Sequence, residues 1–236
     1  MRGCDVLKDQ SYVLFGLNRA ILDRVMFPVG ELTKDEVRDI AARSNLPNRD
    51  KPDSVDICFV PDRDYARVVR QRRPEGFTEG NVLDRTGCVV GRHKGIGRYT
   101  IGQRRGLGIA AGRPIYVTQL DVLNNTVTVG ERDDLLAPVL IADRANFLVD
   151  PPERRFRAQV KIRYLHKAVP ATVEILAPGM AHTMGPPFQS VKVRVVFDEP
   201  QRAITPGQAV VFYDGEVVLG GAWIERSAEK TKSPSV

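Results

Sequence analysis

The chain has 236 residues, 42% hydrophobic and 27% charged, a composition ordinary for a globular protein of one large domain or of two to three small ones. No apolar run reaches the roughly 18–20 residues that cross a bilayer, and the N-terminal MRGCDVLKDQ has no signal-peptide core, which predicts a cytoplasmic protein with no membrane partner. The formal net charge of +6 favours a polyanionic partner such as nucleic acid, and a simply basic soluble protein is the alternative.

The first 60 residues have a helical pattern. Apolar residues at helical spacing over 12–25, with Asp9 as N-cap, predict one helix. Thr33 and Glu36 form a capping box that begins a second helix, which Leu46-Pro47 ends. Two helices without a sheet do not make a stable domain, so we expect the tail of something larger, with exposed apolar faces that promote aggregation.

After Pro61 the sequence turns to strands. A short basic helix over Tyr65–Arg72 precedes two predicted hairpins, one of NVLD with CVVG and one of IYVTQLDVL with TVTVG. Between the hairpins, residues 91–108 contain six glycines and, counting His93, six basic side chains. This stretch contains no Walker A motif (G-x-x-x-x-G-K-S/T) and no G-x-G-x-x-G that opens a helix after a strand. A basic loop that touches an RNA backbone is therefore favoured over a nucleotide site.

From about residue 138 the pattern consists of strands alone. Five or six short antiparallel strands in under a hundred residues are typical of a small barrel. Asp214-Gly215, between two apolar strands, predicts a type I′ hairpin. The polar residues 227–236 predict a disordered tail.

One predicted barrel strand carries several candidate binding side chains. Alternation places two cations on one face of this strand and two ring side chains on the other, namely Lys161 and Arg163 against Tyr164 and His166. An exposed arginine beside an aromatic ring suits the phosphate and base of RNA, and a solvated strand face is the alternative.

The cysteines are few and odd in number. Cys4, Cys58 and Cys88 show no disulfide or zinc spacing, and the three histidines are scattered, so we predict reduced thiols and no metal. Cys58 stands between Ile57 and Phe59, which favours burial. A reactive thiol is the alternative, but it needs a lowered pKa or a nearby base, and the acidic residues just upstream would raise the thiol pKa.

Six short motifs occur in one order along the chain and together resemble the bacterial tRNA-specific 2-thiouridylase family. The resemblance extends from about residue 2 to residue 226. The motifs are K-D-Q-S-Y (Lys8 to Tyr12), F-P-V-G-E-L (Phe27 to Leu32), D-S-x-x-I-C-F (Asp53 to Phe59), G-x-H-x-G (Gly91 to Gly95), T-x-G-Q-R-x-G-L-G (Thr100 to Gly108) and T-P-G-Q-x-x-V-F-Y-x-G-E (Thr205 to Glu216).

The resemblance implies an α+β multi-domain fold. Residues 1–61 would be the C-terminal end of an α/β ATP-pyrophosphatase domain, residues 62–137 a small β-rich central domain, and residues 138–226 a C-terminal antiparallel β-barrel. The implied reaction places sulfur on the wobble uridine of tRNA. ATP adenylates the C2 oxygen of the uridine, a cysteine persulfide charged by a sulfur-donor protein delivers sulfur to C2, and a second cysteine ends in a disulfide.

The resemblance also implies roles for individual residues. Cys58 matches the cysteine that bears the persulfide. The tRNA-contacting positions are Lys8, Asp9, Gln10, Arg163, Tyr164 and Gln208. The target base must leave its stack to reach the persulfide.

The sequence departs from the family pattern in two respects. It contains neither the S-G-G-V-D-S-type ATP loop nor the first catalytic cysteine, and Asp56 puts a negative charge beside the persulfide position. We therefore expect the C-terminal two-thirds of a 2-thiouridylase, truncated, split or partial, with its ATP site elsewhere and no activity alone. The alternatives are a tRNA-binding or sulfur-carrying module that works with a separate N-terminal ATP-binding chain, and a structural barrel without an RNA role.

Overall fold

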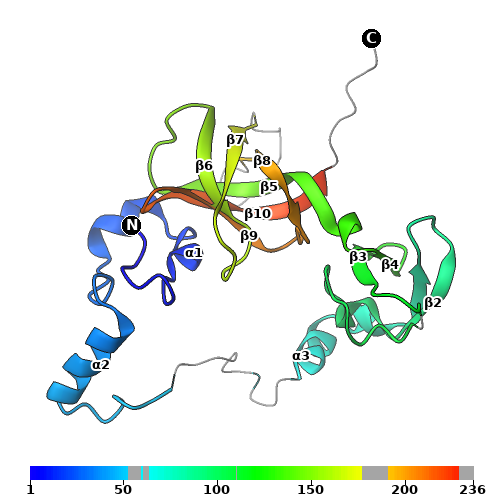
Figure 1. Cartoon of the computed structure of the whole chain (residues 1–236), viewed down its shortest axis with the longest axis horizontal. Coiled ribbons are helices and arrows are strands. Elements are labelled where there is room, and N and C mark those ends of the chain that lie inside the picture. Colours follow the sequence, from blue (N-terminus) through cyan, green and yellow to red (C-terminus); the bar gives the residue numbers. More distant parts are fainter. Residues whose placement is uncertain (53–59, 61–63, 110, 177–190, 229–236) are drawn as a thin grey trace. The chain divides into compact units, whose positions relative to one another are not determined.

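The computed structural model describes residues 1–52, 60, 64–109, 111–176 and 191–228 (Figure 1). Contacts divide the chain into two compact units. The barrel unit comprises Met1–Lys51, Pro138–Pro200 and Pro206–Val236, and the central unit comprises Pro52–Ala137 and Gln201–Thr205. None of the helices in the described part of the chain is long and apolar enough to span a membrane.

The barrel unit is built on a closed six-stranded barrel in the order β10-β5-β8-β7-β6-β9, which confirms the predicted barrel. Alternation sets its interior, since Phe156, Ala158 and Val160 are buried between exposed neighbours on one strand. The strands are β5 (Leu136–Phe147), β6 (Arg155–Lys161), β7 (Val169–Ile175), β8 (Val193–Arg202), β9 (Ala209–Asp214) and β10 (Val217–Ala228).

Strand β9 departs from alternation because both of its faces are covered. Five consecutive residues from Ala209 to Tyr213 are buried. Ala209, Val211 and Tyr213 form a cluster with Tyr12 and Phe15 from the N-terminal segment. A continuous apolar run is the expected composition of such a doubly covered strand.

The β9–β10 hairpin is shifted by one residue from the predicted turn. Asp214 pairs with Val217, so the two central turn residues are Gly215 and Glu216 rather than Asp214 and Gly215. Only the first of them, Gly215 at φ 53°, has a positive φ. This is the pattern of a type II′ turn, whereas the type I′ turn that we predicted needs a positive φ at both positions.

The N-terminal segment contains three short helices instead of two. The predicted helix over 12–25 is wrong, because α1 (Ser11–Leu14) ends after one turn and a 3-10 helix follows at Arg19–Arg24. The Asn18 side chain accepts the N–H of Ala20 and begins the second helix afresh. The capping box of Thr33 and Glu36 is confirmed at the start of α2 (Lys34–Arg43).

The central unit has the predicted helix α3 (Tyr65–Arg72) and both predicted hairpins. They combine into one four-stranded sheet, ordered β2-β1-β4-β3, through a parallel pairing of β1 with β4. The strands are β1 (Gly80–Leu83), β2 (Val89–His93), β3 (Tyr116–Asp121) and β4 (Thr126–Gly130), and the core comprises Val82, Ile96, Leu107, Val117, Val127 and Val129.

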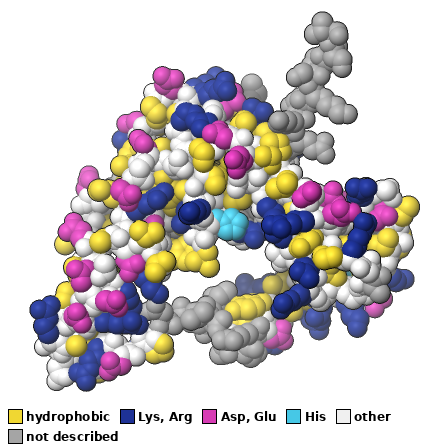
Figure 2. All heavy atoms as spheres, viewed as in Figure 1, with side chains coloured by type: hydrophobic (Ala, Val, Ile, Leu, Met, Phe, Trp, Pro, Cys, Tyr) yellow, Lys and Arg dark blue, Asp and Glu magenta, His cyan; other side chains and the backbone are white. Residues whose placement is uncertain are grey.

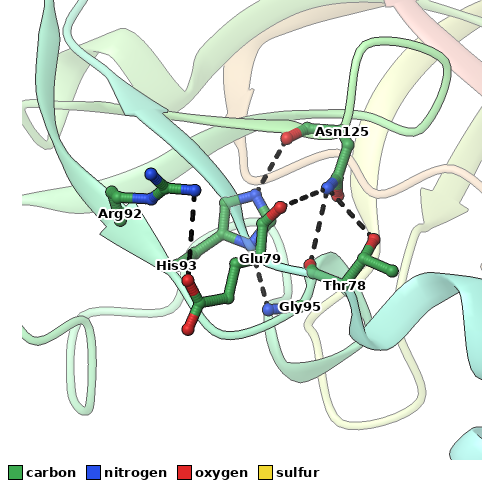
Figure 3. A network of polar contacts seen from close by, with 6 residues as sticks. All are labelled: Thr78, Glu79, Arg92, His93, Gly95 and Asn125. Carbon is green, nitrogen blue, oxygen red and sulfur yellow. Dashed lines mark hydrogen bonds and ion pairs between the residues drawn. The ribbon is translucent and has the colours of Figure 1, made fainter.

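The glycine-rich stretch 91–108 contributes to this core rather than forming only a surface loop. Its His93 is 1% exposed, and its Nδ1 accepts the N–H of Gly95 at 3.1 Å. The other ring nitrogen, Nε2, therefore carries the proton and donates to the carbonyl of Asn125 at 3.0 Å (Figure 3). A Cβ on Gly80 would lie 2.5 Å from that nitrogen, so the histidine fills the space that this glycine leaves.

Candidate nucleic-acid interface

Residues 1–17, here called the N-terminal strap, dock on the outer face of the barrel. The N–H of Arg2 donates to the carbonyl of Glu216 at 2.7 Å, and the Asn146 side-chain amide donates to the carbonyls of Phe15 and Leu17. Phe15 is 3% exposed and lies over Gly221, where a Cβ would approach its ring to 2.6 Å. The strap therefore needs a glycine at this position of β10.

The K-D-Q-S-Y motif folds around the Asp9 carboxylate. Its Oδ1 accepts the N–H groups of Gly3 and Ser11, each at 3.0 Å, and its Oδ2 accepts the Ser11 hydroxyl at 2.8 Å. Burial raises the Asp9 pKa, but these hydrogen bonds and the positive charge of Lys161 outweigh it, so the pKa lies below its usual value. Asp9 is thus an ionised acceptor that closes a turn of the strap.

Tyr12 joins the strap to two other predicted contact segments. Its hydroxyl donates to the carbonyl of Ala209 at 2.7 Å, directly after Gln208 in the chain. Its ring centroid lies 6.2 Å from that of Tyr164. Burial raises the pKa of Tyr12 to about 12, partly offset by the positive charge of Arg163, so the hydroxyl remains a donor at physiological pH.

The Arg163-Tyr164 pair lies in a turn and not on a strand. Strand β6 ends at Lys161, and the N–H of His166 donates to the carbonyl of Arg163 at 3.1 Å. The predicted alternation of these side chains across a strand is therefore wrong beyond Lys161. The turn instead exposes 37% of Tyr164 and places the Lys161 ammonium 5.9 Å from the Tyr164 ring centroid.

Positive charge gathers around these aromatic rings. The Arg2 guanidinium lies 4.1 Å from the ring centroid of Tyr213, and its Nε is buried without a hydrogen-bond partner in the described part of the chain. Burial lowers the pKa of Lys161, aided by Arg2 and opposed by Asp9. Figure 2 shows Lys and Arg side chains, in dark blue, on the surface of both units.

Of the residues predicted to contact tRNA, Asp9, Arg163 and Tyr164 are brought together around Tyr12. Gln208 is exposed one residue before the carbonyl that Tyr12 binds, and Lys8 and Gln10 are exposed on the strap. Cys58 lies outside the described residues. Sequence reasoning missed the clustering role of Tyr12, which the helical pattern had assigned to an ordinary apolar face.

No metal site accompanies this cluster in the residues that the structure describes. No group of three or more His, Cys, Asp and Glu side chains there is placed to hold an ion. The two described cysteines, Cys4 and Cys88, are both free and exposed.

Three family descriptions match the chain in succession. Residues 1–62 match the tRNA methyl transferase HUP domain, residues 68–131 the tRNA methyl transferase PRC-barrel domain, and residues 138–224 the aminomethyltransferase beta-barrel domain. The tRNA-specific 2-thiouridylase MnmA of Carboxydothermus hydrogenoformans is 48% identical over 226 residues, which are 95% of this chain and 59% of the relative. Over 95% of its length this chain is similar to tRNA-specific 2-thiouridylases.

Two further 2-thiouridylases show the same extent of similarity. That of a Roseiflexus species is 49% identical over 227 residues, 96% of this chain and 58% of the relative. That of Geobacter metallireducens is 46% identical over 225 residues, 95% of this chain and 58% of the relative. The chain thus spans about three fifths of the length of the curated 2-thiouridylases that it matches.

Proposed function

We propose that this chain is the tRNA-binding and sulfur-carrying part of a tRNA 2-thiouridylase. The observation that supports the proposal is the cluster at Tyr12. Three segments, at Asp9, Tyr164 and Gln208, meet on one face of the barrel unit, although the first lies more than 150 residues before the other two in the chain. In this proposal Lys8, Asp9, Gln10, Arg163, Tyr164 and Gln208 form the tRNA contacts, and residues 1–61, 62–137 and 138–226 are the three family domains.

The cluster has the chemistry that an RNA backbone and an unpaired base require. Arg163 and Lys161 supply positive charge for phosphate, and the exposed ring of Tyr164 supplies a surface for stacking. The partly buried carboxylate of Asp9 does not oppose phosphate binding as a free charge would, because two N–H groups and a hydroxyl already donate to it.

In the proposed reaction, ATP converts the C2 oxygen of the wobble uridine to an adenylate and pyrophosphate leaves. The terminal sulfur of a persulfide on Cys58, supplied by a donor protein, forms a bond to C2 as AMP departs. A second cysteine then attacks the Cys58 sulfur, which breaks the S–S bond, leaves sulfur on C2 and forms a disulfide. The 236 residues contain no ATP loop of the family type, so we propose that they complete this cycle only together with an ATP-binding part that lies outside these residues.

Binding is tested with a labelled tRNA transcript and fluorescence anisotropy at several salt concentrations. We expect log Kd to change steeply with log salt, by about 0.9 for each phosphate contacted in duplex regions. Arg163→Ala should weaken binding by about fivefold or more, and Arg155→Ala, an exposed arginine on β6, is the matched control. Undetectable binding, or equal losses in the two variants, would contradict the proposed interface.

Sulfur carriage is tested by incubating the chain with a persulfide-donor protein and measuring the mass of each cysteine-containing peptide. We expect one added sulfur on Cys58, lost in Cys58→Ser and retained in Cys4→Ser and Cys88→Ser. Assayed by itself with ATP and the donor, the chain should form no 2-thiouridine. Formation of 2-thiouridine under those conditions would refute the need for an ATP-binding part outside these residues.

A further inference from the structure

A bulge in strand β5 places one arginine in an unfavourable backbone conformation. Asn146 pairs with Gly221 and Asp143 pairs with Trp223, so Arg144 and its successor lie opposite a single residue of β10. Arg144 has φ 53°, a region that side chains other than glycine, asparagine and aspartate seldom occupy. Bulges of this kind redirect side chains, and the strain points to a use for the redirected group.

The redirected guanidinium lies over the only tryptophan of the chain. The Arg144 Cζ is 5.6 Å from the centroid of the Trp223 ring, within the range of a cation–π contact. The ring packs edge-on against Phe15 of the strap, with centroids 5.5 Å apart, and 39% of Trp223 remains exposed. The indole is therefore held in place on one side while a large apolar area stays open to solvent.

The charges around Trp223 favour an anion. Two carboxylates lie nearby, and both are engaged: Asp143 accepts the N–H of Arg144 at 2.6 Å, and Glu225 pairs with the Lys192 ammonium at 2.6 Å. Arg226 acts on Lys192 as a further nearby positive charge. Among the described side chains around Trp223, positive charges thus outnumber negative ones, which favours an anionic group such as a phosphate over a neutral or cationic one.

We infer that Trp223 and Arg144 form a second RNA contact, at which an unpaired base stacks on the indole and the arginine binds its phosphate. The inference rests on the proposed tRNA binding and extends it beyond the family positions. The site is continuous with the proposed interface, because Trp223 pairs with Ala209 and the N–H of Ile224 donates to the carbonyl of Gln208 at 2.8 Å. Stacking on aromatic rings beside arginine is the usual way to hold a single-stranded base.

The single tryptophan gives a direct readout of this contact. The chain is titrated with a labelled tRNA transcript while anisotropy reports binding and tryptophan emission reports the state of Trp223. We expect the emission to fall in step with binding. Trp223→Leu, which keeps apolar bulk against Phe15, should weaken binding by about fivefold or more, and Trp223→Phe should restore part of the loss.

Arg144 offers a variant that separates binding from folding. Arg144→Gly suits the positive φ, so the midpoint of unfolding should not fall, whereas tRNA affinity should drop and the salt slope should decrease by about one. Arg144→Lys should keep most of the slope, and Arg155→Ala serves as the control for a lost surface charge.

The outcomes distinguish this inference from the proposal beneath it. If anisotropy reports tRNA binding while tryptophan emission stays constant and the Trp223→Leu and Arg144→Gly variants bind like the original chain, the second contact is refuted and the proposed function stands. If the original chain shows no binding by anisotropy, the proposed function fails and this inference fails with it.

Discussion

Replacing Tyr12 by phenylalanine removes a single oxygen from the point where the strap joins the barrel. That hydroxyl donates to the carbonyl of Ala209 at 2.7 Å, and only 6% of Tyr12 is exposed. Loss of a buried hydrogen bond that leaves its acceptor unpaired costs about 1–2 kcal/mol, and the ring of Phe still fills the space. We therefore expect Tyr12→Phe to lower the free energy of unfolding of the barrel unit by about 1–2 kcal/mol at pH 7.

The same residue predicts a dependence on alkaline pH. The pKa of Tyr12 is about 12 in the folded chain and near 10 when unfolded, because burial disfavours the phenolate. The stability that this shift contributes is complete below pH 10 and is lost as the pH rises towards 12, by up to about 2.7 kcal/mol. In Tyr12→Phe that loss should be smaller, and Tyr213, whose pKa burial also raises, contributes to the loss that remains.

Urea denaturation followed by tryptophan emission measures both effects, because Trp223 contacts Phe15 of the strap and reports on the barrel unit. The two proteins are compared at pH 7 and at intervals above pH 10, so that other titrating groups cancel in the difference. An equal free energy of unfolding at pH 7, or parallel stability curves above pH 10, would show that the hydroxyl does not anchor the strap.

Two further substitutions test the strap. Asp9→Asn should lower the free energy of unfolding by about 1 kcal/mol at pH 7 and should reduce the loss of stability in acid. The Asp9 pKa lies below its unfolded value, so the stability that it contributes disappears as the pH falls through the folded pKa. Urea titrations from pH 7 to pH 2 test this, and an unchanged acid dependence would contradict it. Gly221→Ala should lower stability by about 2 kcal/mol or more and should weaken tRNA binding, since its Cβ would meet both the Phe15 ring and the carbonyl of Val210. Gly207→Ala is the control, because its Cβ would have open space and only the positive φ should cost about 1 kcal/mol. Similar losses of stability in thermal unfolding of the two variants would contradict the steric argument.

The sequence predicted the elements with strong local signals. The capping box at Thr33, the helix over Tyr65–Arg72 and both hairpins of the central unit are specified by side chains within a few residues of one another. The six-stranded barrel followed from apolar alternation and from strand number. The helix and the hairpins depend on local interactions, whereas for the barrel the sequence reports only the alternation within each strand.

The sequence-based predictions failed where distant segments decide the local structure. The helix expected over 12–25 is interrupted because Tyr12 and Phe15 dock on β9, a strand nearly 200 residues away in the chain. His93 was counted among the basic side chains of a surface loop, yet contacts with Gly95 and Asn125 make it a core residue. The unusual backbone conformation of Arg144 could not be predicted from the sequence pattern, because a bulge depends on how two strands pair.

The residues proposed to bind tRNA also show what the sequence could predict and what it could not. The positions were predicted from collinear motifs, but the motifs say nothing of how the three segments meet. The structure shows that Tyr12 joins them and that Arg163 lies in a turn after β6. For residues 53–59, which contain Cys58, the motif remains the basis of the prediction.

The docking of the strap determines the order in which the barrel unit forms. The contact between Tyr12 and Ala209 spans 197 residues, and the central unit lies entirely between its two ends. Closing so long a loop is slow and entropically costly before the contact is made. During synthesis residues 1–17 leave the ribosome long before β9. They therefore have no strand to pack against until the barrel closes. We therefore expect the cluster at Tyr12 to be among the last parts of the barrel unit to assemble, so that the proposed RNA contact would form only after β9 has been synthesised.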